Sequence, residues 1–166
     1  MDISRVAAMV RAALTAIPPP ARPRAVALTA RLDGDVTPAG AVREGPLGAG
    51  SEYGLSGSGV ARPGTFGRVR LAGGLRVAVG PDPATGTVRL ALTETLVRPA
   101  GDRLTVLRVL DAGHVDADVL HGTGQWTVIG GTGGLAAASG SGTGELTLDL
   151  AHRRFTSTLA GRIRLR

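Results

Sequence analysis

The residue whose position most suggests chemistry is Glu94, an acid on the apolar side of an expected β-strand. Alternate positions of the segment 87–97 are apolar and would face a core: Val88, Leu90, Leu92 and Leu96. Glu94 fills the remaining place in that row, where a carboxylate is costly unless it is paired, hydrogen-bonded or protonated. Two interpretations stay open. Glu94 is either a structural acid, in an ion pair or at a wet rim, or a catalytic group that orients a ligand or transfers a proton.

Arg108 is the expected partner of Glu94. If residues 98–102 form the turn between two antiparallel strands, Val97 lies opposite Arg103, and the apolar positions of the second strand face the same side as Glu94. Arg108 then lies diagonal to Glu94, within reach of a charge pair across the hairpin. A turn one residue longer or shorter would place Arg108 on the outer face.

Two aromatic residues complete the candidate binding site. The chain has four aromatic residues in all: Tyr53, Phe66, Trp126 and Phe155. A core so poor in large rings favours an interior cavity, although aliphatic side chains also fill small barrels. Trp126 is either a core residue or a wall of that cavity, and Tyr53 is expected to be a second wall residue.

The composition excludes several other kinds of site. The chain has no Cys, Lys or Asn, so it has no thiolate nucleophile, Schiff-base lysine or disulfide. His114, Asp116 and Asp118 alternate along one expected strand, but three such positions span roughly 13 Å, too far for one metal ion. The glycine-rich corner has neither a G-x-S-x-G motif nor a helix suited to a dinucleotide. We therefore expect no metal and no cofactor.

Positive charge is spread along the chain rather than massed. The net charge is +6, and all 19 basic residues are Arg. Arg68, Arg70 and Arg76 share one strand face, which a solvated outer wall explains as well as a binding role does. Stacking aromatics beside these charges are lacking. We therefore do not expect a nucleic-acid partner.

The first 17 residues have the apolar spacing of an amphipathic helix, and Pro18–Pro20 end it. This helix is either packed on the domain surface, a lid over a barrel mouth, or a membrane-surface anchor. It is too short and too charged to span a bilayer and makes a poor secretory signal, so a cytoplasmic location is expected. Residues 18–24 form a stiff linker, and residues 25–166 form the main domain.

After the linker the hydrophobic period is two, which is typical of β-strands. Asp33 and Gly34 are expected to begin a turn into a long loop, 34–50. The expected strands are 24–33, 52–61, 68–79, 87–97, 104–110, 114–120, 124–129, 142–150 and 155–165. Eight or nine such strands joined by short turns predict an all-β protein, a closed antiparallel barrel of about eight strands, with an open sandwich as the second interpretation.

The run WTVIGGTGGLAAASGSGTG, residues 126–144, resembles the glycine-rich corner of the allene oxide cyclase and dirigent superfamily of barrels. Those families have G-G-T-G, a large apolar residue, then A-x-A/G-x-G-x-G. The segment 56–75 is similar to bacterial members, and the exclusive use of Arg over Lys suggests a GC-rich bacterial genome. The resemblance covers residues 51–165 loosely and rests on structural glycines, so it implies the fold rather than a reaction.

Two classes of function follow. The resemblance implies a cofactor-free cyclase or isomerase that folds a small, apolar, polyketide-like molecule inside the barrel, as bacterial [4+2] cyclases do. Orientation by a shaped cavity and one polar group, Glu94, would suffice for such a reaction. The alternative is a non-catalytic barrel that binds a small molecule or a protein. A cavity reaching Glu94 would favour the enzyme, and a homodimer is compatible with both.

Overall fold

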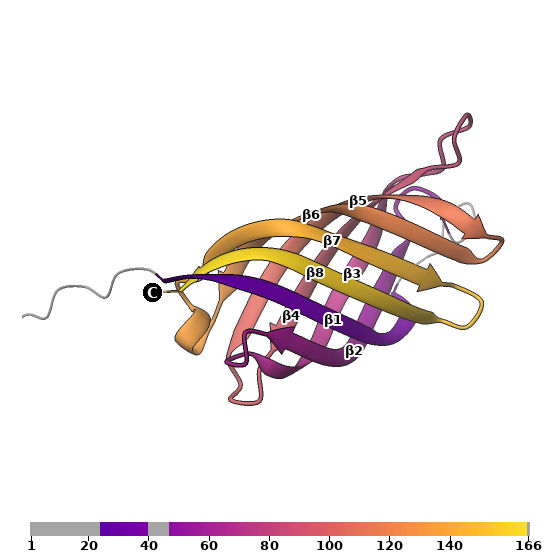
Figure 1. Ribbon diagram of the computed structural model, residues 1–166. Coiled ribbons are helices and arrows are strands. Elements are labelled where there is room, and N and C mark those ends of the chain that lie inside the picture. Colours follow the sequence, from indigo (N-terminus) through magenta and orange to yellow (C-terminus); the bar gives the residue numbers. More distant parts are fainter. Residues whose placement is uncertain (1–23, 40–46, 166) are drawn as a thin grey trace, which may run out of the picture.

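The protein is a closed barrel of eight antiparallel strands (Figure 1). The computed structural model describes residues 24–39 and 47–165; the expected helix 1–17 lies outside these residues, as does the linker 18–24 apart from Arg24. A short 3-10 turn, η1 (Gly133–Leu135), precedes β7. The strands are β1 (Arg24–Pro38), β2 (Glu52–Arg62), β3 (Gly67–Val79), β4 (Val88–Val97), β5 (Arg103–Asp116), β6 (Val119–Gly131), β7 (Ser139–Asp149) and β8 (Arg154–Leu165).

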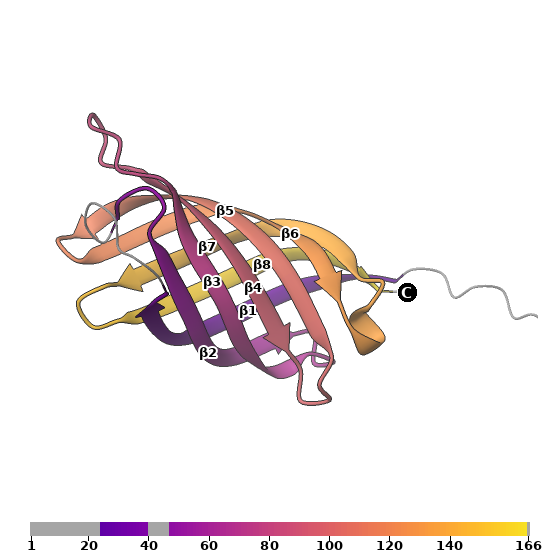
Figure 2. The ribbon, with the colours of Figure 1, turned by 180° about the vertical axis from the view of Figure 1, so that it is seen from behind.

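Each strand pairs with the next in the chain, and β8 pairs with β1 to close the tube (Figures 1 and 2). The expected closed barrel is thereby confirmed over the open sandwich. A ladder of paired residues that leaves β1 at Pro38 and passes once around the barrel returns to β1 at Leu28, ten residues away. This stagger tilts the strands against the barrel axis, so residues far apart in the sequence meet inside.

Alternating side chains decide which face of each strand lines the interior. In β4, for example, Val88 and Leu90 are fully buried, whereas Arg89 between them points outward. The same pattern holds on all eight strands, and aliphatic residues make up most of the core. The described residues contain no helix long and apolar enough to cross a bilayer.

Glycines on β7 and β8 make room for the largest interior side chain, Trp126. A Cβ atom on Gly142 would lie 2.8 Å from Cε2 of Trp126, and one on Gly161 would lie 2.5 Å from its Cζ2. The indole Nε1 donates to the backbone oxygens of Thr143 at 2.9 Å and Ala160 at 3.3 Å. Gly142 of the corner motif and Gly161 of β8 therefore allow these two strands to pass directly against the ring.

Two local expectations are wrong. β1 continues through Asp33 and Gly34 to Pro38, so no turn begins there. Gly34 faces inward opposite Gly57, where a side chain would collide with the β2 backbone, so this glycine serves close strand approach. The expected strand 114–120 is instead a tight hairpin whose turn at Ala117 and Asp118 joins β5 to β6. The number of strands is therefore eight.

Replacing Gly161 by Ala tests the contact with Trp126. The added methyl group would overlap the indole ring and the adjoining backbone, so we expect the free energy of unfolding to fall by about 1–3 kcal/mol. Urea unfolding followed by circular dichroism measures the change. Gly130→Ala is the matched control, because a Cβ on that β6 glycine meets nothing within 4 Å. Equal destabilisation by both substitutions would contradict the packing argument.

Candidate functional site

A fully buried ion pair joins β4 to β5 inside the barrel. Arg108 Nη1 lies 3.0 Å from Oε2 and 3.1 Å from Oε1 of Glu94, and both side chains have 0% exposure. The register confirms the expected hairpin, since Val97 pairs with Arg103 and Glu94 with Val106, which places Arg108 on the diagonal. The structure therefore brings together the two charged residues that the sequence paired.

Arg108 also reaches across the interior to the last two strands. Its Nη1 donates to Oγ of Ser157 on β8 at 2.6 Å, and its Nη2 donates to the backbone oxygen of Glu145 on β7 at 3.0 Å. Among the described residues, nothing accepts a hydrogen bond from its Nε. One guanidinium thus connects four strands and keeps one donor unused.

Ser157 and the Glu145 carbonyl are site groups that the sequence analysis missed. Ser157 is 2% exposed and sits in the inward row of β8, between the buried Phe155 and Leu159. This position could have been recognised in the sequence, because a lone hydroxyl on an apolar strand face needs a hydrogen-bond partner. A backbone oxygen such as that of Glu145 cannot be identified from the pattern of side chains.

Glycines clear the space that the charged pair occupies. Gly73 on β3 lies opposite Glu94, and a Cβ there would lie 2.5 Å from the backbone oxygen of Thr93 and 3.2 Å from Cα of Glu94. A Cβ on Gly144 of β7 would lie 2.9 Å from Nη2 of Arg108. The pair is therefore held in a position that the neighbouring strands are built to accommodate.

Burial raises the pKa of Glu94, because the ionised carboxylate loses its contact with water. The charge of Arg108 and its hydrogen bonds act in the opposite direction and are the smaller effect. Glu94 therefore retains a proton to a higher pH than an exposed glutamate does.

The two aromatic candidates differ in their relation to the pair. Trp126 lies opposite Arg108 in the β5–β6 ladder and is 1% exposed. Tyr53 is also buried, and burial raises the pKa of its phenol, but it lies on β2, with β3 between it and Glu94. The structure thus places Trp126 beside Arg108, and it places Tyr53 in the same register row but three strands away from Arg108.

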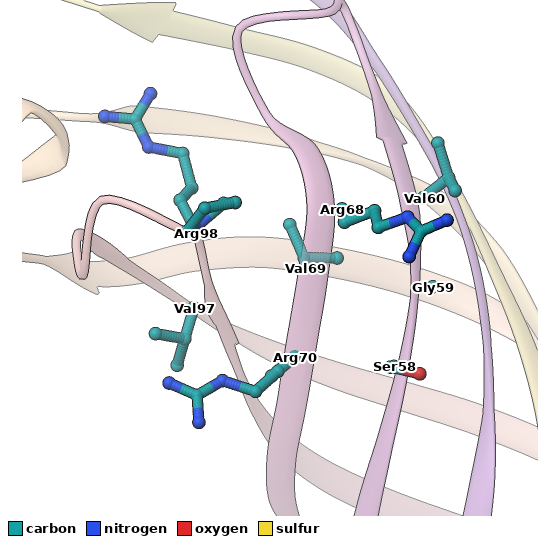
Figure 3. A pocket seen from close by; sticks show the side chains of 9 residues that line it. Ser58, Gly59, Val60, Arg68, Val69, Arg70, Val97 and Arg98 are labelled. Atoms are coloured by element: carbon teal, nitrogen blue, oxygen red, sulfur yellow. The ribbon is translucent and has the colours of Figure 1, made fainter.

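Three grooves are formed entirely by described residues, and neither Glu94 nor Arg108 lines any of them. The largest, about 510 Å³, lies over β2, β3 and the end of β4 and includes Arg68 and Arg70 (Figure 3). The second, about 470 Å³, lies over β6, β7 and β8. The third, about 220 Å³, lies where Arg89 and Asp111 pair on the surface. These grooves therefore do not supply the cavity reaching Glu94 that would favour the enzyme.

The expected row of His114, Asp116 and Asp118 does not form one strand face. His114 and Asp116 lie in β5, whereas Asp118 lies in the hairpin turn, and all three are exposed. Within residues 24–39 and 47–165, no three His, Asp or Glu side chains are grouped so that they could hold a metal ion.

Removing one partner of the buried pair should be much more harmful than removing both. We expect Glu94→Leu to lower the free energy of unfolding by about 3–5 kcal/mol, because it leaves the Arg108 charge buried and unpaired. Adding Arg108→Met should restore most of that loss, as measured by chemical denaturation. The exposed pair Arg89–Asp111 spans the same two strands, and Asp111→Leu should have little effect. If the losses of unfolding free energy caused by the two substitutions simply add in the double variant, the argument that the two charges stabilise each other is contradicted.

The stability of the protein should respond to the ionisation of Glu94. Because the folded state raises its pKa, its contribution is complete below the ordinary glutamate pKa of about 4.3 and is lost as the pH rises through the folded-state pKa. The destabilisation caused by Glu94→Gln should therefore shrink as the pH increases through this range. Unfolding free energies of both proteins, measured from pH 4 to 8, give the difference profile, and a difference that grows with pH would show a lowered pKa instead.

Comparisons with known proteins relate the fold to one group of barrels. No protein-family model matches the chain, and no curated protein matches it. Among solved structures, the chain is similar to the pterocarpan synthase dirigent protein GePTS1, with a TM-score of 0.59 and 10% identity over 87% of this chain and 92% of that chain. It is also similar to the pterocarpan synthase dirigent protein PsPTS1, with a TM-score of 0.56 and 12% identity over 86% and 96%. At these identities the likeness concerns the fold alone: the chain has an eight-stranded barrel fold like that of these two proteins.

Proposed function

We propose that the barrel interior binds a small, mainly apolar molecule beside Glu94 and Arg108 and promotes its ring closure or isomerisation without a cofactor. The molecule enters through an end of the barrel, because the pair is fully buried and lines none of the three outer grooves. Entry requires movement of the aliphatic side chains that line the interior.

The observation that carries this proposal is the Nε donor of Arg108, which has no acceptor within residues 24–39 and 47–165 and lies in a mainly aliphatic interior. A buried ion pair often contributes less stability than aliphatic side chains of the same volume, so its presence needs another reason. A buried N–H group without an acceptor adds a further cost. An oxygen atom of a bound molecule would accept that hydrogen bond and remove the cost.

The residues of the interior have different roles in the proposed reaction. Aliphatic walls hold a flexible molecule in a reactive conformation, which removes much of the entropy cost of ring closure. Arg108 donates from Nε to a carbonyl or ether oxygen of the molecule. Glu94 and Ser157 fix the guanidinium. Cyclisation and isomerisation conserve atoms, so no co-reactant is required.

The structural neighbours support a role in small-molecule chemistry, since both are named as synthases and dirigent proteins. The glycine-rich corner supports the finer assignment to allene oxide cyclase-like barrels and to [4+2] cyclases acting on polyketide-like molecules. The exclusive use of Arg as the basic residue supports a bacterial source. A cytoplasmic location and a homodimer belong to the same proposal.

A second candidate function is binding without bond chemistry. Both carboxylate oxygens of Glu94 already lie 3.0–3.1 Å from Arg108 Nη1, which favours a carboxylate that positions Arg108 over one that removes a proton from a substrate. In that case the barrel presents an oriented molecule to another reaction and does not change it.

A neutral fluorescent probe, N-phenyl-1-naphthylamine, tests uptake by the interior. Displacement of the probe ranks a library of apolar polyenes that carry a carbonyl group, and chromatography and NMR then show whether the bound compounds isomerise. The variants are Glu94→Gln and Arg108→Met. Their matched controls are Asp111→Asn and Arg89→Met, which alter the exposed pair on the same two strands.

We expect the wild type and both controls to bind the probe and the library compounds. Glu94→Gln should remain folded and lose conversion, because the guanidinium is no longer fixed by a charge. If the wild type binds the compounds without converting them, and the two variants lose this binding, the non-catalytic function is the right one. Unchanged conversion in Glu94→Gln would remove Glu94 from the site, and absence of probe uptake by the wild type would overturn the proposal.

A further inference from the structure

The groove over β2, β3 and β4 combines free positive charge with an aliphatic floor (Figure 3). Its volume of about 510 Å³ lies in the range of small-molecule sites. Arg68 is paired in register with Val60, and Arg70 with Val97, so each guanidinium stem begins beside an aliphatic side chain. In Figure 3 the two arginines extend to opposite sides of β3.

The two central arginines have no counter-charge among the described residues. None of the ion pairs formed within residues 24–39 and 47–165 includes Arg68 or Arg70. The third arginine of the groove, Arg98, is different, because it pairs with Asp102 and lies 5.6 Å from the Phe66 ring centroid. The lining contains no acidic residue. The groove therefore offers two uncompensated guanidinium groups.

The barrel extends this charge beyond the groove. Arg31 on β1 is paired in register with Val60, and Arg103 on β5 with Val97, so each of these valines has an arginine on both neighbouring strands. All four arginines are exposed. Residues dispersed along the sequence are thus gathered on one wall, where their potentials add.

Two acidic residues of β1 lie close to an arginine of β8. Asp33 lies 3.8 Å and Asp35 lies 3.5 Å from Arg154, which approaches them from β8. Neither of these acids forms an ion pair with Arg68 or Arg70.

We propose that this groove binds a small amphiphilic anion, a phosphate monoester with a short aliphatic body. A phosphate monoester carries close to two negative charges at neutral pH, so both arginines attract it, although in the arrangement of Figure 3 they lie on opposite sides of β3 and only one guanidinium binds it directly. Guanidinium groups bind phosphate oxygens through paired hydrogen bonds. The aliphatic body lies along Val60, Val97 and Pro99, which line the same groove.

A single-stranded nucleic acid fits this wall less well. Such ligands rely on stacking of bases against exposed aromatic rings. All four aromatic side chains are buried: Tyr53, Phe66, Trp126 and Phe155. The observations therefore favour an aliphatic phosphate, and they do so independently of the interior pair, since Glu94 and Arg108 do not line this groove.

The probe for the test is n-octyl phosphate, used below its micelle concentration in low-salt buffer. Titration of ¹⁵N-labelled protein should give saturable amide shifts at Val60, Arg68, Arg70 and Val97. Octanol and inorganic phosphate, tested separately, should each bind about tenfold more weakly or worse, because each supplies half of the recognition.

The double variant Arg68→Gln/Arg70→Gln should lower the affinity for octyl phosphate about tenfold or more. Arg162→Gln/Arg164→Gln is the matched control, with the same spacing and charge change on exposed positions of β8 that do not line the groove. This control should change the affinity less than about twofold. Both pairs are exposed, so the variants should fold, and uptake of N-phenyl-1-naphthylamine should be unchanged, which separates this site from the interior one.

Three results would overturn the proposal. The first is equal loss of affinity in both double variants, which would show general charge attraction only. The second is absence of saturable shifts in the groove of the wild type. The third is binding to phosphatidylglycerol vesicles without binding of monomeric octyl phosphate, which would identify a membrane surface as the partner.

Discussion

The limited space inside a tube of eight strands constrains every other feature of this protein. Such a barrel is filled by its own side chains, so each large inward residue requires a small one nearby. Trp126 and Arg108 are the largest fully buried side chains, and inward glycines of β7 and β8 lie against both. The glycine-rich corner is therefore a packing device that admits one indole ring and one guanidinium. Without those glycines, neither the apolar interior nor its buried charges would fit.

The charges of the interior and of the outer wall differ in their surroundings. Arg108 inside is paired with Glu94 and held by hydrogen bonds to β7 and β8, and of its nitrogens only Nε lacks an acceptor in the described part of the chain. Arg68 and Arg70 outside keep their full charge in water, where it costs little. The interior therefore suits a nearly neutral molecule with a single acceptor, whereas the wall suits an anion. The net charge of the chain does not show that the interior and the outer wall differ in this way.

Local features were predictable where a short turn fixed the register. The five residues 98–102 set the pairing of β4 with β5, and this was enough to place Arg108 beside Glu94. The contact with Ser157 was not predictable, because it depends on the stagger of the whole barrel, which alternation does not encode. The turn expected at Gly34 was wrong for a different reason. A glycine serves both turns and close strand approach, and its neighbours in the sequence do not distinguish the two.

The pairing of β1 with β8 joins the two most distant strands of the described chain. All other pairs are between consecutive strands, so this single seam changes a curled sheet into a tube. A protein cut short before β8 would leave the backbone donors and acceptors of β1 and β7 unmatched at the same time. Such exposed edges recruit strands from other molecules, so loss of the final strand would lead to aggregation rather than to a smaller soluble domain.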